Sequence, residues 1–275
     1  AFDFKVRELK NEPTLQYIRD SWLMAMAEMD SKQRATWEAI YDKKNEEFLK
    51  NPPVGKDLLR WKYQRYVKEY CRTIRSVDEQ VGRLLDYLEE KGVLDNTVIV
   101  YTSDQGFLLG EHGLYDKRFM YEESFRTPLI ISCPSLVKKH SVCKELVQNI
   151  DLAPTFLSLA GVEVPKEMSG RSLLPLFKNG KAENWRNELY YHFYDYPAVG
   201  SVRKHDGIRT KRYKLIHWYG EGSGNDEAID FWELYDLKKD VMEVNNVYDN
   251  PKYVKVREAL TVQLEKLRKD VGVTE

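Results

Sequence analysis

The clearest pattern of apolar and polar positions runs from Lys56 to Glu90. Apolar residues recur there three and four positions apart, which is the spacing of one face of an amphipathic helix. Gly92 follows and is suited to a left-handed C-cap. The stretch 14–50 is also rich in helical spacing, and Asn51-Pro52-Pro53 separates it from the longer helix. The long stripe consists of Tyr63, Tyr66, Val67, Tyr70, Ile74, Val77, Val81, Leu84, Leu85 and Leu88.

Two short segments after this helix have the composition of buried strands. Thr97–Thr102 is β-branched and almost continuously apolar, a pattern typical of a strand covered on both faces in a parallel sheet. Pro128–Cys133 predicts a second buried strand. Asn149–Gly161 predicts a helix, with Asp151 as its N-cap and Pro154 in its first turn. A helix followed by a buried strand indicates the α/β class.

The pattern changes after about Pro175. Segments 188–196, 207–219 and 231–237 read as antiparallel strands, and Gly220–Asn225 reads as a loop between two of them. A final helix is predicted from about Pro251 to Lys269. We therefore expect two domains, an α/β portion over residues 1–180 and a small α+β domain with an antiparallel sheet over residues 181–275.

Composition excludes several classes of protein. The chain has 275 residues and a formal net charge of -1, so no basic excess indicates a nucleic-acid partner. Its apolar runs are too short for a membrane span. The three cysteines, Cys71, Cys133 and Cys143, form neither a disulfide framework nor a zinc motif. Buried free thiols are expected, with a Cys133–Cys143 bridge as the alternative.

Asp104, Gln105 and Gly106 come directly after the first predicted strand. Ligands of open α/β sheets bind beyond the carboxyl ends of the strands. Carboxylate and amide oxygens suit calcium or magnesium better than zinc, and glycine permits a sharp turn. Taken alone, these three residues favour an ordinary turn at the end of a strand.

The residues that follow favour a functional site. Gly110-Glu111-His112-Gly113 places a histidine in a small loop, and Asp116-Lys117-Arg118 follows it. Lysine supplies a compact positive charge for a tetrahedral anion, and arginine binds such an anion through two parallel hydrogen bonds. Each cation alone is typical of a solvated surface. Several cations within fifteen residues after a buried strand indicate an oxyanion site.

The stretch 97–128, TVIVYTSDQGFLLGEHGLYDKRFMYEESFRTP, closely resembles the type I sulfatases of the alkaline phosphatase-like superfamily. Their pattern has a strand, Ser-Asp-(Asn/Gln/His)-Gly, Gly-Glu-His-Gly, a lysine, and Arg-x-Pro. Residues 70–94 and 193–237 resemble the flanking helix and the small C-terminal domain. The likeness is nearest to bacterial mucin-desulfating and N-acetylglucosamine-6-sulfatases. It implies an α/β fold, part of an alkaline phosphatase-like sheet with flanking helices.

The resemblance also implies roles for individual residues. Asp104 and Gln105 match two of the family's calcium ligands, and Lys117 matches the lysine that holds the substrate sulfate. His112 is expected to contact the substrate or to steady the loop. The substrate-binding residues expected beside them are Arg118, Arg203, His205 and Arg209. For the last three, an ordinary structural role in the small domain is an equal alternative.

The sequence also departs from the family. It contains no (C/S)-x-P-x-R motif, whose first residue becomes formylglycine; Cys133-Pro134-Ser135-Leu136 lacks both its spacing and its arginine. The resemblance therefore implies a missing amino-terminal half that carries formylglycine and further calcium ligands. We expect the 275-residue chain alone to be inactive because it lacks this nucleophile.

A sulfated glycan such as mucin or a glycosaminoglycan is the substrate that the resemblance implies. A phosphatase or phosphodiesterase of the same superfamily is an alternative, although such enzymes usually place histidine beside the aspartates where this chain has Gln105. A non-catalytic glycan-binding or interaction module is a second alternative. No export signal is visible, and the resemblance implies a periplasmic or secreted protein.

Overall fold

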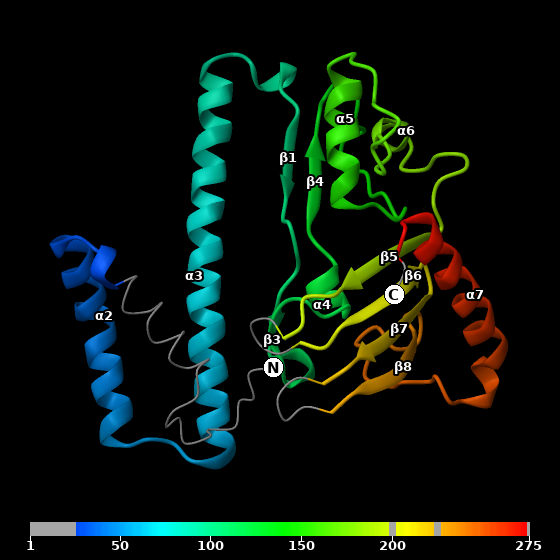
Figure 1. Ribbon diagram of the computed structural model, residues 1–275. Coiled ribbons are helices and arrows are strands. Elements are labelled where there is room, and N and C mark those ends of the chain that lie inside the picture. Colours follow the sequence, from blue (N-terminus) through cyan, green and yellow to red (C-terminus); the bar gives the residue numbers. More distant parts are fainter. Residues whose placement is uncertain (1–25, 198–201, 223–226, 274–275) are drawn as a thin grey trace. The chain divides into compact units, whose positions relative to one another are not determined.

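A computed structural model describes residues 26–197, 202–222 and 227–273 (Figure 1). The chain divides into two compact units. One consists of Ala1–Leu84 and Leu109–Tyr115, and the other consists of Leu85–Leu108 and Asp116–Glu275. Each unit is described by itself. The domain boundary near residue 180 stays a prediction, as does the loop at Gly220–Asn225, of which 223–226 lie outside the described residues.

The first unit contains a helical hairpin. Helix α2 (Ser31–Lys50) begins at a capping box, in which Asp30 accepts the Gln33 N–H at 2.8 Å. Helix α3 (Gly55–Glu90) returns antiparallel to it. The two helices are joined by a Phe48–Trp61 stack at 4.2 Å, an Arg65–Asn45 hydrogen bond at 3.1 Å and a Tyr41–Glu69 hydrogen bond.

Helix α3 confirms the prediction from the apolar stripe almost to the residue. Gly92 ends it with φ 67°. The Gly92 N–H donates to the Glu89 carbonyl at 2.8 Å, and the Val93 N–H donates to the Leu88 carbonyl at 3.0 Å. The second bond spans five residues, as expected for a glycine C-cap. A short 3-10 turn, η1 (Leu94–Asn96), then leads into the first strand.

The first strand confirms the predicted location but corrects its predicted surroundings. Strand β1 (Ile99–Thr102) pairs with β4 (Leu129–Ser132) in an antiparallel two-stranded sheet. Tyr101 is 39% exposed and Ile130 is 64% exposed, so neither strand is buried on both faces in the described chain. A continuous apolar run shows that both faces tolerate burial. It does not give the direction of the neighbouring strand, which the intervening connection decides.

The segment after β4 packs around a small apolar core. The 3-10 turn η3 (Asn149–Asp151) leads into α5 (Leu152–Leu159), and the short α6 (Leu174–Phe177) follows. Figure 1 shows α5 beside β4. The buried residues Leu173, Leu176 and Phe177 pack there with partly buried side chains of both elements, namely Leu129, Ile131, Leu152 and Leu159, and with Trp185.

Asp151 occupies the N-cap position of α5, as predicted, but its side chain makes no capping hydrogen bond to that helix. Asp151 is also the N3 residue of the preceding turn η3, whose N-cap is Gln148. Its buried carboxylate accepts the Gln148 N–H and the Arg171 N–H, each at 2.8 Å, and forms a two-bond ion pair with Arg186. Pro154 does lie in the first turn of α5, as predicted.

The second unit is dominated by an antiparallel sheet in the order β5-β6-β7-β8. The strands are β5 (Glu188–Phe193), β6 (His205–Thr210), β7 (Tyr213–Gly220) and β8 (Ile229–Asp236). The predicted strand 207–219 is in fact the hairpin of β6 and β7. Its tight turn lacks glycine and proline, and it is closed instead by the Thr210 hydroxyl, which accepts the Tyr213 N–H at 2.9 Å.

Both faces of this sheet are covered. Helix α7 (Val254–Asp270), preceded by the 3-10 turn η4 (Pro251–Tyr253), lies along one face in Figure 1. Its Leu260 and Leu264 form a buried cluster with Ile208, Leu215 and Leu234 of the sheet. On the other face, the buried Met120 packs with Ile216, Trp218 and Tyr235. The segment around Met120 therefore packs on the face of the sheet opposite α7.

The cysteines differ partly from the expectation of buried thiols. Cys133 is buried, whereas Cys71 and Cys143 are exposed, and all three are free. Among the described residues, no helix combines the length and apolar composition that a membrane crossing requires.

Candidate functional site

Ser103, Asp104 and Gln105 form a turn at the end of β1. The Ser103 hydroxyl donates to the Gln105 carbonyl at 2.8 Å. The Asn149 amide donates to the carbonyls of Ser103 and Asp104 at 3.1 and 2.9 Å. Asp104 is exposed and Gln105 is half-buried. A single asparagine from η3 therefore fixes the backbone that carries both predicted metal ligands.

Gly106 is required by a close backbone approach. Its N–H donates to the Ser124 carbonyl at 2.8 Å, and the Phe107 N–H donates to the Glu123 carbonyl at 2.7 Å. A Cβ on Gly106 would overlap the Glu123 carbonyl oxygen. The sequence predicted a sharp turn at this glycine, and the structure gives a different reason for it. The helical turn α4 (Glu122–Phe125) packs directly against the end of the metal-ligand segment.

The donors at this turn fit a hard cation in part. A carboxylate and an amide carbonyl are oxygen ligands of the kind that calcium and magnesium take. Two ligands are far fewer than the 6–8 that calcium usually takes. In residues 26–197, 202–222 and 227–273, no group of three or more His, Cys, Asp or Glu side chains could hold a metal. Asp104 and Gln105 would therefore hold only one side of such an ion.

His112 lies in a loop of the first unit. It is exposed and has φ 55°, between Gly110 at φ 122° and Gly113 at φ 71°. Tyr115, at the end of this loop, packs edge-to-face on Tyr66 of α3 at 4.8 Å, and burial raises its pKa to about 12. The short strands β2 (Leu108–Leu109) and β3 (Tyr115–Asp116) pair at the base of the loop.

Lys117 and Arg118 lie in the second unit, together with Asp104 and Gln105. Both cations are half-buried. The Arg118 guanidinium forms an ion pair with Asp116, and the Arg118 carbonyl accepts the Tyr191 hydroxyl at 2.6 Å. Asp116 and Arg118 have φ 79° and 87°, a left-handed conformation that is rare for residues other than glycine. Lys117 is thus flanked on both sides by strained backbone.

The structure favours the structural alternative for His205, and its contact with a substrate stays a prediction. Its side chain is fully buried, stacked on Trp218 at 4.1 Å, with Nδ1 2.9 Å from the Arg203 carbonyl oxygen. Burial lowers the pKa of His205 to about 4, so the ring is neutral at ordinary pH. Dense aromatic packing around β6 accounts for the burial of His205, and a sequence pattern does not show such packing.

The two arginines predicted to bind substrate also have partners within the fold. The Arg209 guanidinium pairs with both oxygens of Glu122, at 3.2 and 3.3 Å. The Arg203 guanidinium donates to the Glu227 carbonyl at 2.8 Å and lies over the Tyr196 ring at 4.7 Å. These contacts favour the structural alternative for both residues, and their contact with a substrate stays a prediction.

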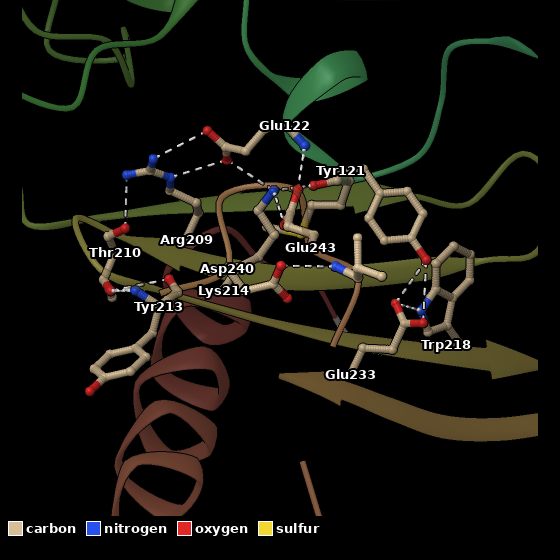
Figure 2. A network of polar contacts seen from close by, with 12 residues as sticks. Tyr121, Glu122, Arg209, Thr210, Tyr213, Lys214, Trp218, Glu233, Asp240 and Glu243 are labelled. Atoms are coloured by element: carbon tan, nitrogen blue, oxygen red, sulfur yellow. Dashed lines mark hydrogen bonds and ion pairs between the residues drawn. The ribbon is translucent and has the colours of Figure 1, made fainter. Parts of the chain in front are cut away.

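Sequence reasoning missed Lys214, which the structure buries completely. Figure 2 shows its ammonium between Glu122 and Glu243, with nitrogen–oxygen distances of 2.9 and 2.7 Å. The Lys214 Nζ also donates to the Met120 carbonyl at 2.6 Å. A lysine inside the apolar run of β7 was the only sequence signal. Its partners lie too far away in the chain to be identified from spacing.

Sequence reasoning also missed Asn149. It gives no local signal, because its two acceptors, the carbonyls of Ser103 and Asp104, lie more than forty residues upstream.

Comparison with protein families identifies the family to which the chain belongs. The sulfatase family matches residues 26–162, and the C-terminal domain family of N-sulphoglucosamine sulphohydrolase matches residues 110–270. The chain belongs to the sulfatase family. The two matches overlap across residues 110–162, which include Lys117 and Arg118. This confirms the family predicted from the resemblance of residues 97–128.

Individual relatives agree with this assignment. An N-acetylglucosamine-6-O-sulfatase of Bacteroides thetaiotaomicron is 46% identical over 97% of this chain and 47% of its own length. A multifunctional alkaline phosphatase superfamily protein of Trinickia caryophylli is 35% identical over 67% of this chain and 36% of its own. The chain spans about half the length of the 6-O-sulfatase that it matches.

A solved structure confirms the fold. It is described as a complex with its substrate D-glucosamine-2-N,6-O-disulfate, and it matches with a TM-score of 0.84 and 46% identity. The match covers 93% of this chain and 51% of that one. The chain has the alkaline phosphatase-like fold of the sulfatases, with the C-terminal antiparallel sheet that the sequence predicted. Family membership implies the usual calcium and formylglycine of sulfatases.

Proposed function

We propose that the protein containing this chain hydrolyses sulfate esters on glycans, with 6-O-sulfated N-acetylglucosamine as its first candidate substrate. The observation that carries this proposal is the 46% identity with an N-acetylglucosamine-6-O-sulfatase, which extends over 97% of the chain. The structural neighbour bound to a 6-O-sulfated glucosamine supports the same class of sugar. Mucin and glycosaminoglycans are the sources of such sugars that fit the proposal.

The predicted site residues between Asp104 and Arg118 each have a proposed part in this reaction. Asp104 and Gln105 would hold calcium through a carboxylate and an amide oxygen, and Asn149 fixes their backbone. The Lys117 ammonium would neutralise a sulfate oxygen and the charge that grows on it in the transition state. His112 and Arg118 are candidates for further contact with the substrate. When present, calcium supplies positive charge and formylglycine supplies the nucleophile.

The 275 residues alone are proposed to be inactive. They contain no (C/S)-x-P-x-R sequence to supply the nucleophile, and two metal ligands do not complete a calcium site. Sulfate release should therefore be undetectable from the purified 275-residue chain. Turnover by this chain would show that the nucleophile assignment is wrong.

The decisive experiment offers the natural protein that contains this chain a panel of esters. N-acetylglucosamine 6-sulfate, a sugar sulfated elsewhere and a phosphodiester are compared, and released sulfate or phosphate is measured by ion chromatography. We expect sulfate release from the 6-sulfate, lost with a calcium chelator and restored by calcium. Equal or faster cleavage of the phosphodiester would contradict the proposal.

A phosphodiesterase or phosphatase activity is the second candidate. The 35% identity with a multifunctional alkaline phosphatase superfamily protein is the observation in its favour. Gln105 argues against it, because the two-metal enzymes of this superfamily usually have histidine there. A protein that bound the sulfated sugar without cleaving any ester would instead be a glycan-binding module. We further propose a periplasmic or secreted location, which cell fractionation with an antibody against the protein tests.

A further inference from the structure

The backbone around Lys117 is strained on both sides. Asp116 and Arg118 have φ 79° and 87°, and neither is glycine. Such residues are unfavourable and persist only where the surroundings hold them firmly. The Asp116–Arg118 ion pair is one such constraint, but it joins only the two strained residues to each other. Something else must fix this segment to the rest of the fold.

Three contacts attach the segment at alternate residues, two from the antiparallel sheet and one from the stretch that follows β8. The Tyr191 hydroxyl of β5 donates to the Arg118 carbonyl at 2.6 Å. The Lys214 ammonium of β7 donates to the Met120 carbonyl at 2.6 Å. The Glu122 N–H donates to Glu243 Oε2 at 2.7 Å. These contacts hold the backbone of residues 118–122 at Arg118, Met120 and Glu122.

The central attachment depends on a buried charge cluster (Figure 2). Lys214 is fully buried and lies 2.9 Å from Glu122 Oε1 and 2.7 Å from Glu243 Oε1. Arg209 pairs with Glu122 from the other side, at 3.2 Å. Burial alone would raise the pKa of Glu122, but Lys214 and Arg209 lower it overall. A buried ammonium with two carboxylates in contact is held rigidly, because breaking any pair leaves a charge without compensation.

Packing prevents residues 118–122 from sliding along the sheet. Met120 is fully buried against Ile216 and Trp218. Opposite it stands Gly207 of β6, where a Cβ would lie 2.6 Å from the Met120 sulfur. A glycine on the sheet thus makes room for one methionine of the segment. The hydrogen bonds and the packing of Met120 therefore fix the same position of residues 118–122 against the sheet.

We propose that Tyr191, Lys214 and Glu243 are positioning residues that hold the backbone of residues 118–122, and through it Lys117, in the orientation that a sulfate ester requires. This inference rests on the proposed function for its catalytic part. It gives the C-terminal sheet a role in the site, although the sheet contributes none of the predicted calcium ligands. It also explains how a strained lysine-bearing turn is maintained.

Tyr191 offers the cleanest test. Burial raises its pKa to about 12, so its hydroxyl keeps the proton that it donates. Tyr191→Phe removes that one hydrogen bond and keeps the ring packed on Phe125 at 5.5 Å. Tyr190→Phe is the matched control. Tyr190 lies on the same strand, and its hydroxyl donates to Asp206 at 3.0 Å, away from residues 118–122.

Both variants are made in the natural protein that contains this chain. Amide hydrogen exchange of residues 117–122 and the kcat and KM for N-acetylglucosamine 6-sulfate are measured. A hydrogen bond worth about 1.4 kcal/mol corresponds to about a tenfold change. We expect exchange in this segment to quicken about tenfold in Tyr191→Phe and kcat/KM to fall about tenfold. Tyr190→Phe should change neither by more than about twofold.

The outcomes separate the two proposals. If Tyr191→Phe matches Tyr190→Phe in both exchange and kinetics, the positioning role is refuted. If the parent protein releases no sulfate, the proposed function fails, and the exchange measurement alone decides whether Tyr191 holds the segment. Faster exchange with unchanged kcat and KM would show that the contact is structural only, which overturns the positioning claim.

Discussion

The burial of His205 makes the stability of the fold sensitive to mild acid. The ring stacks on Trp218 at 4.1 Å, and the nearest charged side chain that affects it is Asp206. Burial dominates, and the pKa of His205 falls from 6.5 to about 4. In the unfolded chain the same ring takes up a proton near pH 6.5. The unfolded state therefore binds more protons than the folded state between these two values.

This difference in bound protons sets the sign and the size of the effect of pH on the free energy of unfolding. The contribution of a neutral buried His205 is fully present above pH 6.5 and is lost as the pH falls to about 4. One pKa unit corresponds to about 1.4 kcal/mol, so the whole contribution is about 3 kcal/mol. About 2 kcal/mol of it disappears between pH 7 and pH 5, where most carboxylates remain ionised.

Urea unfolding followed by tryptophan fluorescence at pH 7 and pH 5 measures the effect. From pH 7 to pH 5, the free energy of unfolding of the parent protein should fall by about 2 kcal/mol more than that of His205→Phe, whose side chain cannot take up a proton. His140→Asn is the control, because His140 is exposed and its left-handed backbone suits asparagine. An identical pH dependence in the parent and in His205→Phe would show that His205 is hydrated or charged in the folded protein.

Three further substitutions test the packing around the site by urea unfolding at neutral pH. Lys214→Met should lower the free energy of unfolding by about 3–5 kcal/mol, because it leaves Glu243 buried without its cation while Glu122 keeps Arg209; a loss under about 1 kcal/mol would argue that the cluster is hydrated. Gly106→Ala should cost about 1–3 kcal/mol, since the new methyl group overlaps a backbone oxygen, and a neutral result would contradict that close approach. Asp151→Asn should lower the free energy of unfolding by about 3–5 kcal/mol, because it leaves the buried Arg186 without its carboxylate partner. An unchanged urea midpoint would refute that pairing.

Local patterns predicted the elements of this fold well. Helix α3 followed from an apolar stripe that runs from Tyr63 to Leu88 and from a glycine that ends the helix. The positions of β1 and β4 followed from short β-branched runs. The relation between these two strands did not follow, because strand direction depends on the connection between them. The N-cap position of Asp151 was predicted, whereas the 3-10 turn before it was not, since such a turn has no distinct sequence pattern.

The site was predictable only where its residues are neighbours in sequence. Asp104, Gln105, His112, Lys117 and Arg118 lie within fifteen residues, so a family pattern can identify them together. The groups that support them come from far along the chain, as the contacts of Asn149 and Lys214 show. The burial of His205 was not predicted, because histidine in a loop-flanked strand looks the same in sequence whether it is buried or exposed.

Sulfate release by matched lysine variants tests the central claim most directly. Lys117→Met is compared with Lys139→Met, an exposed lysine outside the site, in the natural protein that contains this chain. N-acetylglucosamine 6-sulfate is the only substrate, and inorganic sulfate is measured by ion chromatography. We predict that Lys117→Met lowers kcat/KM by about 10²-fold or more while Lys139→Met leaves it unchanged. Equal rates for the two variants would contradict the assignment of Lys117 to the sulfate and, with it, this account of residues 103–118.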